Sequence, residues 1–318
     1  MRWDRPAPTR AGGAPALALA VGIVAVSSSP ILVRVAHLPA VALAFWRCFA
    51  GALLLAPFAA RDPRGRAGPD RALHDAGAAG MGGRGRGQLA AAGVLLAAHF
   101  VCFNASLSLT SVASSTVLVS SSPLFVGLGG AYFLGEAPTR RGWLGIVLAT
   151  MGAGVIGLGD AGAVRFGGRA LLGDALAFAG AALVAGYLLI GRSARRRLPV
   201  ATYSAWVYGA AAAVLLPACL LARAPLGGYR AGSWLALAGV VAGPQLLGHT
   251  VFNGLLARLT AEVVAVVILM EPVGATAAAW PLFHELPQAP FWLGAPLVLA
   301  GVFLASTQRR TPAAATPG

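Results

Sequence analysis

Long apolar runs alternate with short polar segments along almost the whole chain. A helix of roughly 20 apolar residues crosses a bilayer hydrocarbon core about 30 Å thick. The chain contains ten runs of about this length, and the pattern therefore predicts ten transmembrane helices. They are expected at residues 13–35, 40–60, 88–109, 112–135, 142–159, 170–191, 199–222, 233–256, 262–283 and 288–307.

The second pattern is an internal duplication, because the two halves of the chain match at constant offsets. A shift of 160 residues superposes Leu38-Pro39 on Leu198-Pro199, Trp46 on Trp206 and Pro57 on Pro217. A shift of 149 residues superposes Asn104 on Asn253, Pro123 on Pro272, Glu136 on Glu285, Pro138 on Pro287, Gly145 on Gly294 and Gly152 on Gly301.

Each copy of the duplication carries five predicted spans, over residues 13–160 and 170–307, with 1–12 and 308–318 as tails. Because five is odd, the second copy must insert upside down relative to the first. The expected fold is therefore an all-α integral membrane protein made of two inverted five-helix repeats. Inverted repeats are typical of secondary transporters, in which two similar halves exchange conformations.

Composition agrees with a membrane protein, since 58% of the residues are hydrophobic, 11% are charged and the mean hydropathy is +0.75. The net charge of +14 comes from 24 arginines without lysine, which raises the question of nucleic acid binding. Arg34 and Arg47 lie within spans; of the other arginines, 18 fall in the tails and in loops on one side, and four fall in loops on the other. The positive-inside rule then places both termini in the cytoplasm, and a nucleic acid partner is not expected.

Signatures of enzymes and of bound metals are not found in the sequence. Cys48, Cys102 and Cys219 lie in apolar runs without paired spacing, so neither a disulfide framework nor a zinc site is expected. The segment His284-Glu285-Leu286-Pro287-Gln288 begins like a zinc-protease helix, but it lacks the second histidine and contains a proline. We therefore expect no catalytic residues and no cofactor.

The pair Glu271-Pro272 is the strongest candidate for a functional site in the sequence. A carboxylate near the middle of a transmembrane helix costs about 2.5 to 3.5 kcal/mol on insertion scales unless it is compensated. Pro272 removes a backbone donor and breaks the helix, which leaves a carbonyl free to face a cavity. Glu271 is expected to bind a substrate ammonium or to carry a coupling proton, and the alternative is a structural ion pair with Arg47. The first copy has Ser122-Pro123 at this point, which is a second helix break without the charge.

Polar residues in other spans are further candidates for a transport site. His99 and Asn104 lie in the third span, and His249 and Asn253 lie in the eighth. Such pairs can face one cavity, although interhelical hydrogen bonding is an alternative that we favour for the asparagines. Arg47 is about seven residues into the second span, close enough to water to snorkel, and capture of an anionic group is its alternative role.

Glycine and glutamate recur in matching places of the two copies. Gly145 with Gly152, and Gly294 with Gly301, are seven residues apart and share a helix face, so they predict close helix contacts. Glu136 lies at the end of a span, where we expect it to favour the start of the next helix through the helix dipole.

These motifs resemble the EamA family of the drug/metabolite transporter superfamily. The resemblance is carried by Ser122-Pro123-Leu124-Phe125 through Gly135-Glu136, by Met270-Glu271-Pro272-Val273 through His284-Glu285, and by Arg47 in Phe45-Trp46-Arg47. His284 departs from the glycine usual before the terminal glutamate. The family implies a ten-span exporter or exchanger of amino acids or other small metabolites in the bacterial inner membrane. Its motifs specify neither the substrate, the coupling ion nor the oligomeric state.

The expected mechanism is alternating access around a midplane cavity lined by His99, Asn104, Ser122, His249, Asn253 and Glu271, with a small-molecule substrate and a role for protons. An exporter of amphipathic drugs or lipid-linked metabolites is the main alternative, and it requires a cavity that opens sideways to lipid. An intramembrane enzyme is a weaker alternative, because His99, His249 and Glu271 lack a local catalytic motif.

Overall fold

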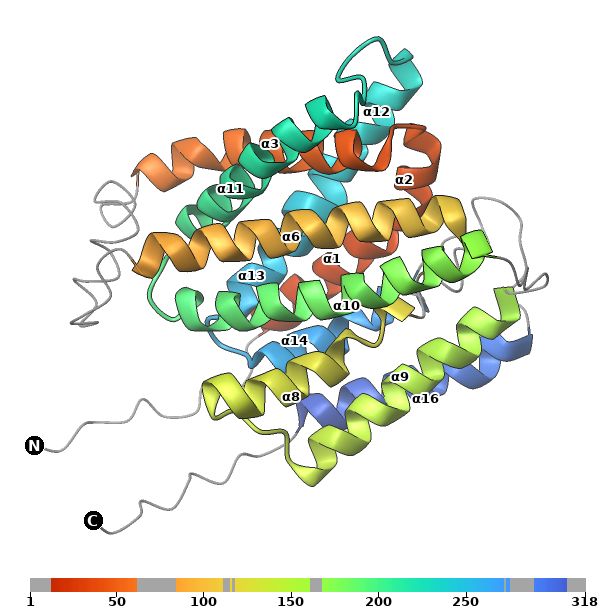
Figure 1. Cartoon of the computed structure of the whole chain (residues 1–318). Helices are drawn as coiled ribbons and strands as arrows, with labels where there is room; N and C mark the ends of the chain where they lie inside the picture. The colour runs from red at the N-terminus through yellow and green to blue at the C-terminus, as the bar shows by residue number, and fades with distance from the viewer. Residues whose placement is uncertain are drawn as a thin grey trace, which may run out of the picture.

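The computed structural model describes residues 13–61, 84–110, 115, 118–160, 168–271, 273–274 and 289–307. These residues form a bundle of helices, and no strand occurs among them (Figure 1). The helices are α1 (Gly13–Ser27), α2 (Ser29–Ala36), α3 (Ala40–Arg61), α6 (Arg84–Leu109), α8 (Ser122–Leu134), α9 (Arg140–Asp160), α10 (Gly168–Arg195), α11 (Val200–Leu221), α12 (Ala231–Val240), the π-helix η1 (Val241–Thr250), α13 (Val251–Leu255), α14 (Ala261–Ile268) and α16 (Ala289–Ser306).

Seven helical stretches in the described part of the chain are long and apolar enough to cross a membrane. They match the first, second, third, sixth, seventh, eighth and tenth expected spans. The 21-residue helix α9 covers the fifth, and the 13-residue α8 is a shorter apolar helix within the fourth. The expected spans at 112–135 and 262–283 are described only in part. The protein is thus a multi-pass helical membrane protein.

The helices of the bundle run roughly alongside one another, and two pairs of helices mark its edges. Figure 1 shows α3 with α11 at one edge and α9 with α16 at the opposite edge, with α6 and α10 between them. The end of α3, the start of α6 and the end of α10 lie at the same end of the bundle. Arg61 at the end of α3, Arg84 at the start of α6, and Arg192 and Arg195 in the last turn of α10 therefore lie at one end of the bundle.

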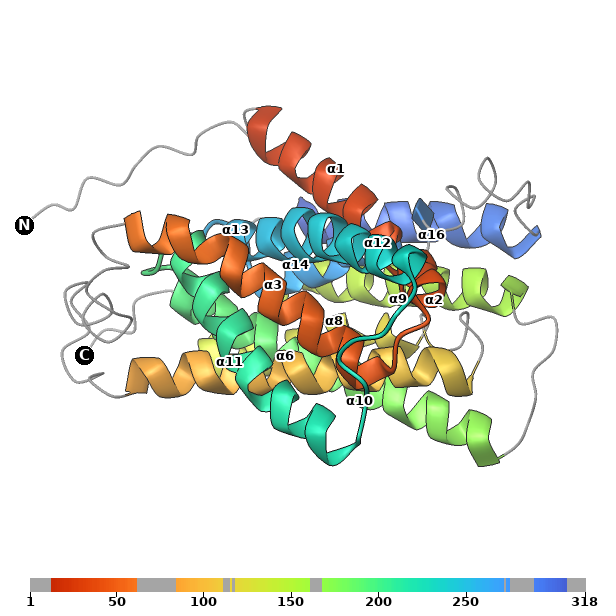
Figure 2. The same cartoon turned by 90° about the horizontal axis from the view of Figure 1, so that it is seen from above.

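Helices α9 and α16 cross at van der Waals contact because glycines line both faces of the crossing (Figure 2). A methyl group added to Gly152 would lie 2.6 Å from the carbonyl oxygen of Gly294, and one added to Gly145 would lie 2.7 Å from that of Gly301. No side chain fits at these distances. The glycine spacing predicts this contact, and the structure confirms it.

Several membrane helices are interrupted near mid-length. Helix α1 gives way to α2 at Ser28, and α8 begins only at Ser122, with Pro123 in its first turn. In the second half, α14 ends at Ile268, just before Glu271. Proline is compatible with the first turn of a helix because the amide hydrogens there have no intrahelical partner. Pro272 itself lies outside the described residues.

Gly135-Glu136 ends α8 and joins it to the rest of the bundle. Gly135 has φ 61°, a left-handed conformation that glycine adopts without strain, and the Glu136 amide donates to the Gly130 carbonyl at 2.8 Å. The Glu136 carboxylate is buried and accepts from Arg192 at 3.1 Å and from Arg196. These ion pairs tie the end of α8 to α10.

The glycine crossing yields a stability prediction. Replacing Gly152 by alanine forces a methyl group into the backbone of α16, and overpacking of this kind costs about 1 to 3 kcal/mol. Gly154, two residues further along α9, has no atom within 4 Å of an added methyl group, so Gly154→Ala is the matched control. We expect Gly152→Ala to lower the free energy of unfolding in detergent titrations, while Gly154→Ala leaves it unchanged or raises it. Equal effects of the two substitutions would contradict the proposed close contact.

Candidate functional site

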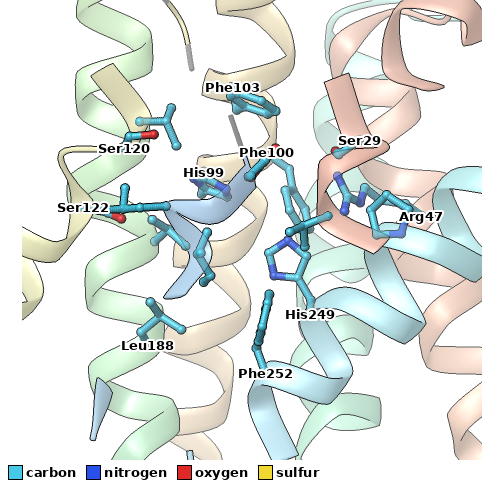
Figure 3. Close-up of a pocket in the computed structure, with 17 residues that line it drawn as sticks. Ser29, Arg47, His99, Phe100, Phe103, Ser120, Ser122, Leu188, His249 and Phe252 are labelled. Carbon is cyan, nitrogen blue, oxygen red and sulfur yellow. The ribbon is translucent and has the colours of Figure 1, made fainter. Parts of the chain in front are cut away.

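The interrupted helices surround a cavity of about 60 Å³ inside the bundle, which we call the central cavity (Figure 3). This volume accommodates a few water molecules. Its polar lining consists of Ser29 of α2, Arg47 of α3, His99 of α6, Ser120 and Ser122 at the start of α8, His249 of η1, and Glu271. Its apolar lining is Val26, Phe100, Phe103, Val119, Val184, Leu188, Pro244, Phe252, Ile268 and Leu269.

The π-helix η1 shapes one wall of the central cavity. It contains Pro244, which removes a backbone donor and cannot sit in a regular α-helical ladder. A π-helix widens the turn, and such segments are frequent at functional sites. Its ten residues bring Gln245 against Arg47 and place His249 in the cavity lining.

Arg47 is the most deeply buried charge of the central cavity, with 1% of its surface exposed. Its Nε donates to Gln245 Oε1 at 2.8 Å, and its guanidinium carbon lies 3.7 Å from the centre of the Phe100 ring. The expectation that Arg47 snorkels to water is wrong, because these partners hold the side chain inside the bundle. Nη2 of Arg47 and Nε2 of Gln245 are buried without a hydrogen-bond partner in the part of the chain that the structure describes.

Both histidines line the central cavity. His99 Nδ1 lies 2.9 Å from the Gly180 carbonyl of α10, and the ring stacks on Phe103 with an interplanar angle of 5°. His249 meets Phe100 edge-on, with ring centres 5.1 Å apart. Figure 3 shows His249 on the same side of the cavity as Arg47, while Ser120 and Ser122 lie on the opposite side.

Glu271 lines the same cavity and is half-buried. Among the residues that the structure describes, ion pairs join Glu136 to Arg192 and to Arg196, and none joins Glu271 to Arg47. The two opposite charges therefore face one cavity without closing on each other. The two side chains still interact electrostatically with each other.

Asn104 and Asn253 do not line the central cavity. The Asn104 amide donates to the Ala40 carbonyl at 3.2 Å, which ties α6 to the start of α3. Asn253 is fully buried, accepts from the Tyr187 hydroxyl, and donates to Ser204 at 3.2 Å. In the described structure both side chains form hydrogen bonds between helices. This is the role that the sequence analysis favours for the two asparagines.

Gln245 holds Arg47 without lining the cavity itself, and the sequence analysis did not single it out. It follows Pro244 inside an apolar run, which is the same combination of proline and buried polar residue that drew attention to Glu271. A polar residue next to a proline inside an apolar run therefore identifies Gln245 as well as Glu271. Phe100 carried no comparable signal, because an aromatic residue in an apolar helix is ordinary packing.

Membrane-length helices, several of them interrupted, surround a cavity lined in part by charged side chains, and this arrangement defines a polytopic membrane protein. The sequence model of the EamA-like transporter family matches residues 14–158 and, a second time, residues 171–307. The chain therefore belongs to the EamA-like transporter family, within the drug/metabolite transporter superfamily.

Solved structures share the fold of this chain, and 28 of their chains match it. One of them, described only as "Crystal structure of protein", aligns over 92% of this chain and 96% of its own length, with a TM-score of 0.70 and 18% identity. At this identity the likeness concerns the fold alone. No curated protein matches the chain.

The hydrogen bonds of Asn253 yield a second stability prediction. Tyr187→Phe leaves the buried Asn253 oxygen without its donor, and such bonds between membrane helices contribute about 0.6 to 1.7 kcal/mol. Tyr132→Phe is the control, because Tyr132 is 84% exposed on α8. Detergent unfolding titrations should show a loss of stability in the first variant alone. An unchanged Tyr187→Phe protein would mean that this bond does not hold α10 against α13.

Proposed function

We propose that the protein is a secondary transporter that exports amino acids or other small metabolites across the bacterial inner membrane by alternating access. The observation that supports this most is the central cavity, which lies between the two family-matched segments and takes Arg47 from the first and Glu271 from the second. The direction of transport rests on the family resemblance. Both termini are proposed to be cytoplasmic, on the side of the arginine-rich helix ends.

The packing pattern supports an inverted arrangement of the two halves. Helix α3 packs on α11, and α9 packs on α16, and each pair consists of segments that the duplication equates. The remaining contacts are reciprocal, since α6 packs on α10 while α1 packs on η1. A two-fold axis between two copies makes a helix on the axis pack against its own equivalent. It makes every other contact occur twice, once for each copy. Two such halves can exchange conformations and expose the cavity to either side in turn.

An ion-pair cluster around the buried Glu136 carboxylate supports a gate at one end of the bundle. Glu136 belongs to the first family-matched segment, whereas Arg192 and Arg196 belong to the second. Arg192 also donates to the Leu256 carbonyl at 2.8 Å, and Arg195 donates to the Asn253 carbonyl at 2.8 Å. The cluster thus joins α8, α10 and the α13 end across the two halves. We propose that it holds this end closed and opens when the cavity faces that side.

The lining of the central cavity favours small polar substrates over amphipathic drugs. Arg47 and His99 are buried in the bundle, and Glu271 faces the same space. Charged groups of this kind are costly in an apolar substrate site and are useful for a charged substrate. An intramembrane enzyme has no support from this lining, because no nucleophile is placed beside a base by the described hydrogen bonds.

The main test is flux of a mixed panel of amino acids and metabolites in proteoliposomes, with and without an imposed pH gradient. We expect substrate flux to follow the gradient in the wild type and to lose that dependence in Glu271→Gln, because the variant cannot bind or release a proton at this position. Glu262→Gln is the matched control. Glu262 is buried on the same segment, and it does not line the cavity.

Each outcome of the flux experiment separates two possibilities. Flux that ignores the gradient in the wild type would indicate a facilitator or exchanger and would remove proton coupling from the proposal. Absence of flux for every compound, inward and outward, would count against the transporter itself. Flux of amphipathic compounds alone would favour the drug-exporter alternative.

The gate yields a separate prediction. Glu136→Gln weakens two ion pairs at once and should raise the population open at that end. We expect faster labelling of a cysteine introduced at Val119, in the cavity lining, by a membrane-impermeant thiol reagent added from that side. The background lacks the native cysteines. Arg197→Gln removes a charge from the same helix end without touching Glu136 and should leave the labelling rate unchanged; equal rates in both variants would exclude the gate.

A further inference from the structure

The π-helix η1 lies in the middle of a membrane-length stretch. Helices α12, η1 and α13 follow one another directly and form the stretch Ala231–Leu255. π-Helices are rare, and most of them are a single turn inside an α-helix. Pro244 removes one regular hydrogen bond, but a π-helix of ten residues needs further contacts to hold it.

Two hydroxyl groups hold the π form of η1. Thr250 Oγ1 donates to the Gln245 carbonyl, five residues earlier, at 3.1 Å. In an α-helix a threonine hydroxyl reaches the carbonyl three or four residues earlier, so this bond fits the wider π turn. The Tyr208 hydroxyl of α11 lies 3.1 Å from Thr250 Oγ1, and it accepts from Asn253 Nδ2 at 3.5 Å. We call Tyr208 and Thr250 the clamp.

The segment that begins at η1 is connected to the central cavity and to the ion-pair cluster. His249 of η1 belongs to the cavity lining. A few residues further on, the carbonyls of Asn253 and Leu256 accept from Arg195 and Arg192, each at 2.8 Å. Arg192 is itself a member of the ion-pair cluster. A change in the helical register of η1 therefore affects both places.

A change of η1 from π to α hydrogen bonding would move these groups relative to each other. A π turn joins residues five apart and an α turn joins residues four apart. The segment beyond it therefore shifts by about one α-helical residue, on the order of 100° of rotation and 1.5 Å of length. The carbonyls of Asn253 and Leu256 would then turn away from the two arginines, and the closed end would lose both of these hydrogen bonds.

We propose that η1 is a conformational switch between a π and an α form, and that it couples the central cavity to the ion-pair cluster. This inference rests on the proposed transport function and its gate, and it adds a movement inside the second family-matched segment. The clamp stabilises the π form, in which the end with the cluster is closed. That end opens in the α form, in which His249 changes its place in the cavity lining. Rocking of two rigid halves needs no such change.

A disulfide inside the second half tests the switch. A methyl group added to Gly254 of α13 would lie 3.8 Å from Cγ2 of Val200, at the start of α11. Cysteines at these two positions are therefore close enough for a disulfide in the π form. Both residues belong to the second family-matched segment, so the bond leaves the two halves free to rock against each other.

The experiment combines Val200→Cys with Gly254→Cys in the full-length protein, which otherwise lacks its native cysteines, in proteoliposomes. Flux of the compounds that the wild type transports is measured before oxidation, after oxidation and after reduction. We expect oxidation to abolish flux and reduction to restore it, because the disulfide holds η1 in the π form. Each single-cysteine variant is a control and should not respond to oxidation. Undiminished flux through the fully cross-linked protein would overturn the switch.

Release of the clamp is an independent test that needs no disulfide. Thr250→Val removes the hydroxyl with little change of shape, whereas Thr250→Ser keeps the hydroxyl. Loss of one hydrogen bond between membrane helices shifts a two-state population by roughly 3- to 20-fold. We expect Thr250→Val to speed the labelling of Val119→Cys from the end with the cluster by this factor, and Thr250→Ser to retain the original rate.

Thr202→Val is the matched control for the clamp. The Thr202 hydroxyl is also buried, on α11, and it has no hydrogen-bond partner among the described residues. Its removal should leave the labelling rate unchanged. Equal rates in Thr250→Val and Thr202→Val would reject the clamp and the switch with it, and these rates decide the question if the disulfide does not form.

The results that would overturn the switch differ from those that would overturn the transport function. Flux that is equal in the reduced and the cross-linked protein leaves the transport function in place and rejects the switch alone. Absence of flux in the wild type and in the reduced double variant would count against the transport function, and the switch would fall with it.

Discussion

Lipid offers no hydrogen-bond partner to the backbone, and this constraint governs the arrangement of the whole molecule. Interrupted helices are tolerated at membrane depth only where protein surrounds them or where they line a polar cavity. The breaks near Ser28, at the start of α8 and after Ile268, together with η1, all border the central cavity. The uninterrupted helices α3, α6, α10 and α11 enclose these breaks, and the cavity is a consequence of where the backbone departs from a regular helix.

Burial inside the bundle also determines how charged side chains are stabilised. Arg47 is buried away from the surface of the bundle, and its closest described contacts are an amide oxygen and an aromatic face. At the end of the bundle the opposite solution occurs, because Glu136 meets two arginines directly. In a direct ion pair the charged groups already satisfy each other. An arginine and a glutamate that line one cavity without a direct ion pair are still able to bind other groups. The two kinds of charged site therefore differ in kind: one ties helices together, and the other places charged groups in the lining of the cavity.

Features that depend on spacing along one helix could be predicted from the sequence. The spans follow from run length, and the α9–α16 contact follows from glycines seven residues apart. The partners of polar side chains could not be predicted in this way. Arg47 and Gln245 are 198 residues apart, and only the packing of η1 against α3 brings them together. Asn104 and Asn253 lie outside the cavity lining because of how their helices are rotated about their own axes. A few polar residues in a nearly all-apolar helix do not define that rotation.

The two copies of the duplication share their helix packing, but they differ in the residues at and next to the central cavity. At the offset that superposes the second and seventh spans, Arg47 corresponds to Val207. At the offset of the later spans, Gln245 corresponds to Leu96 and Glu271 to Ser122. The glycine crossing, by contrast, is kept in both copies. Symmetry is thus retained at the glycine contact between the two halves, and it is lost among the polar and charged side chains at the central cavity. Because of this divergence, the first copy contributes a positive charge to the central cavity and the second a negative one, which two identical repeats could not do.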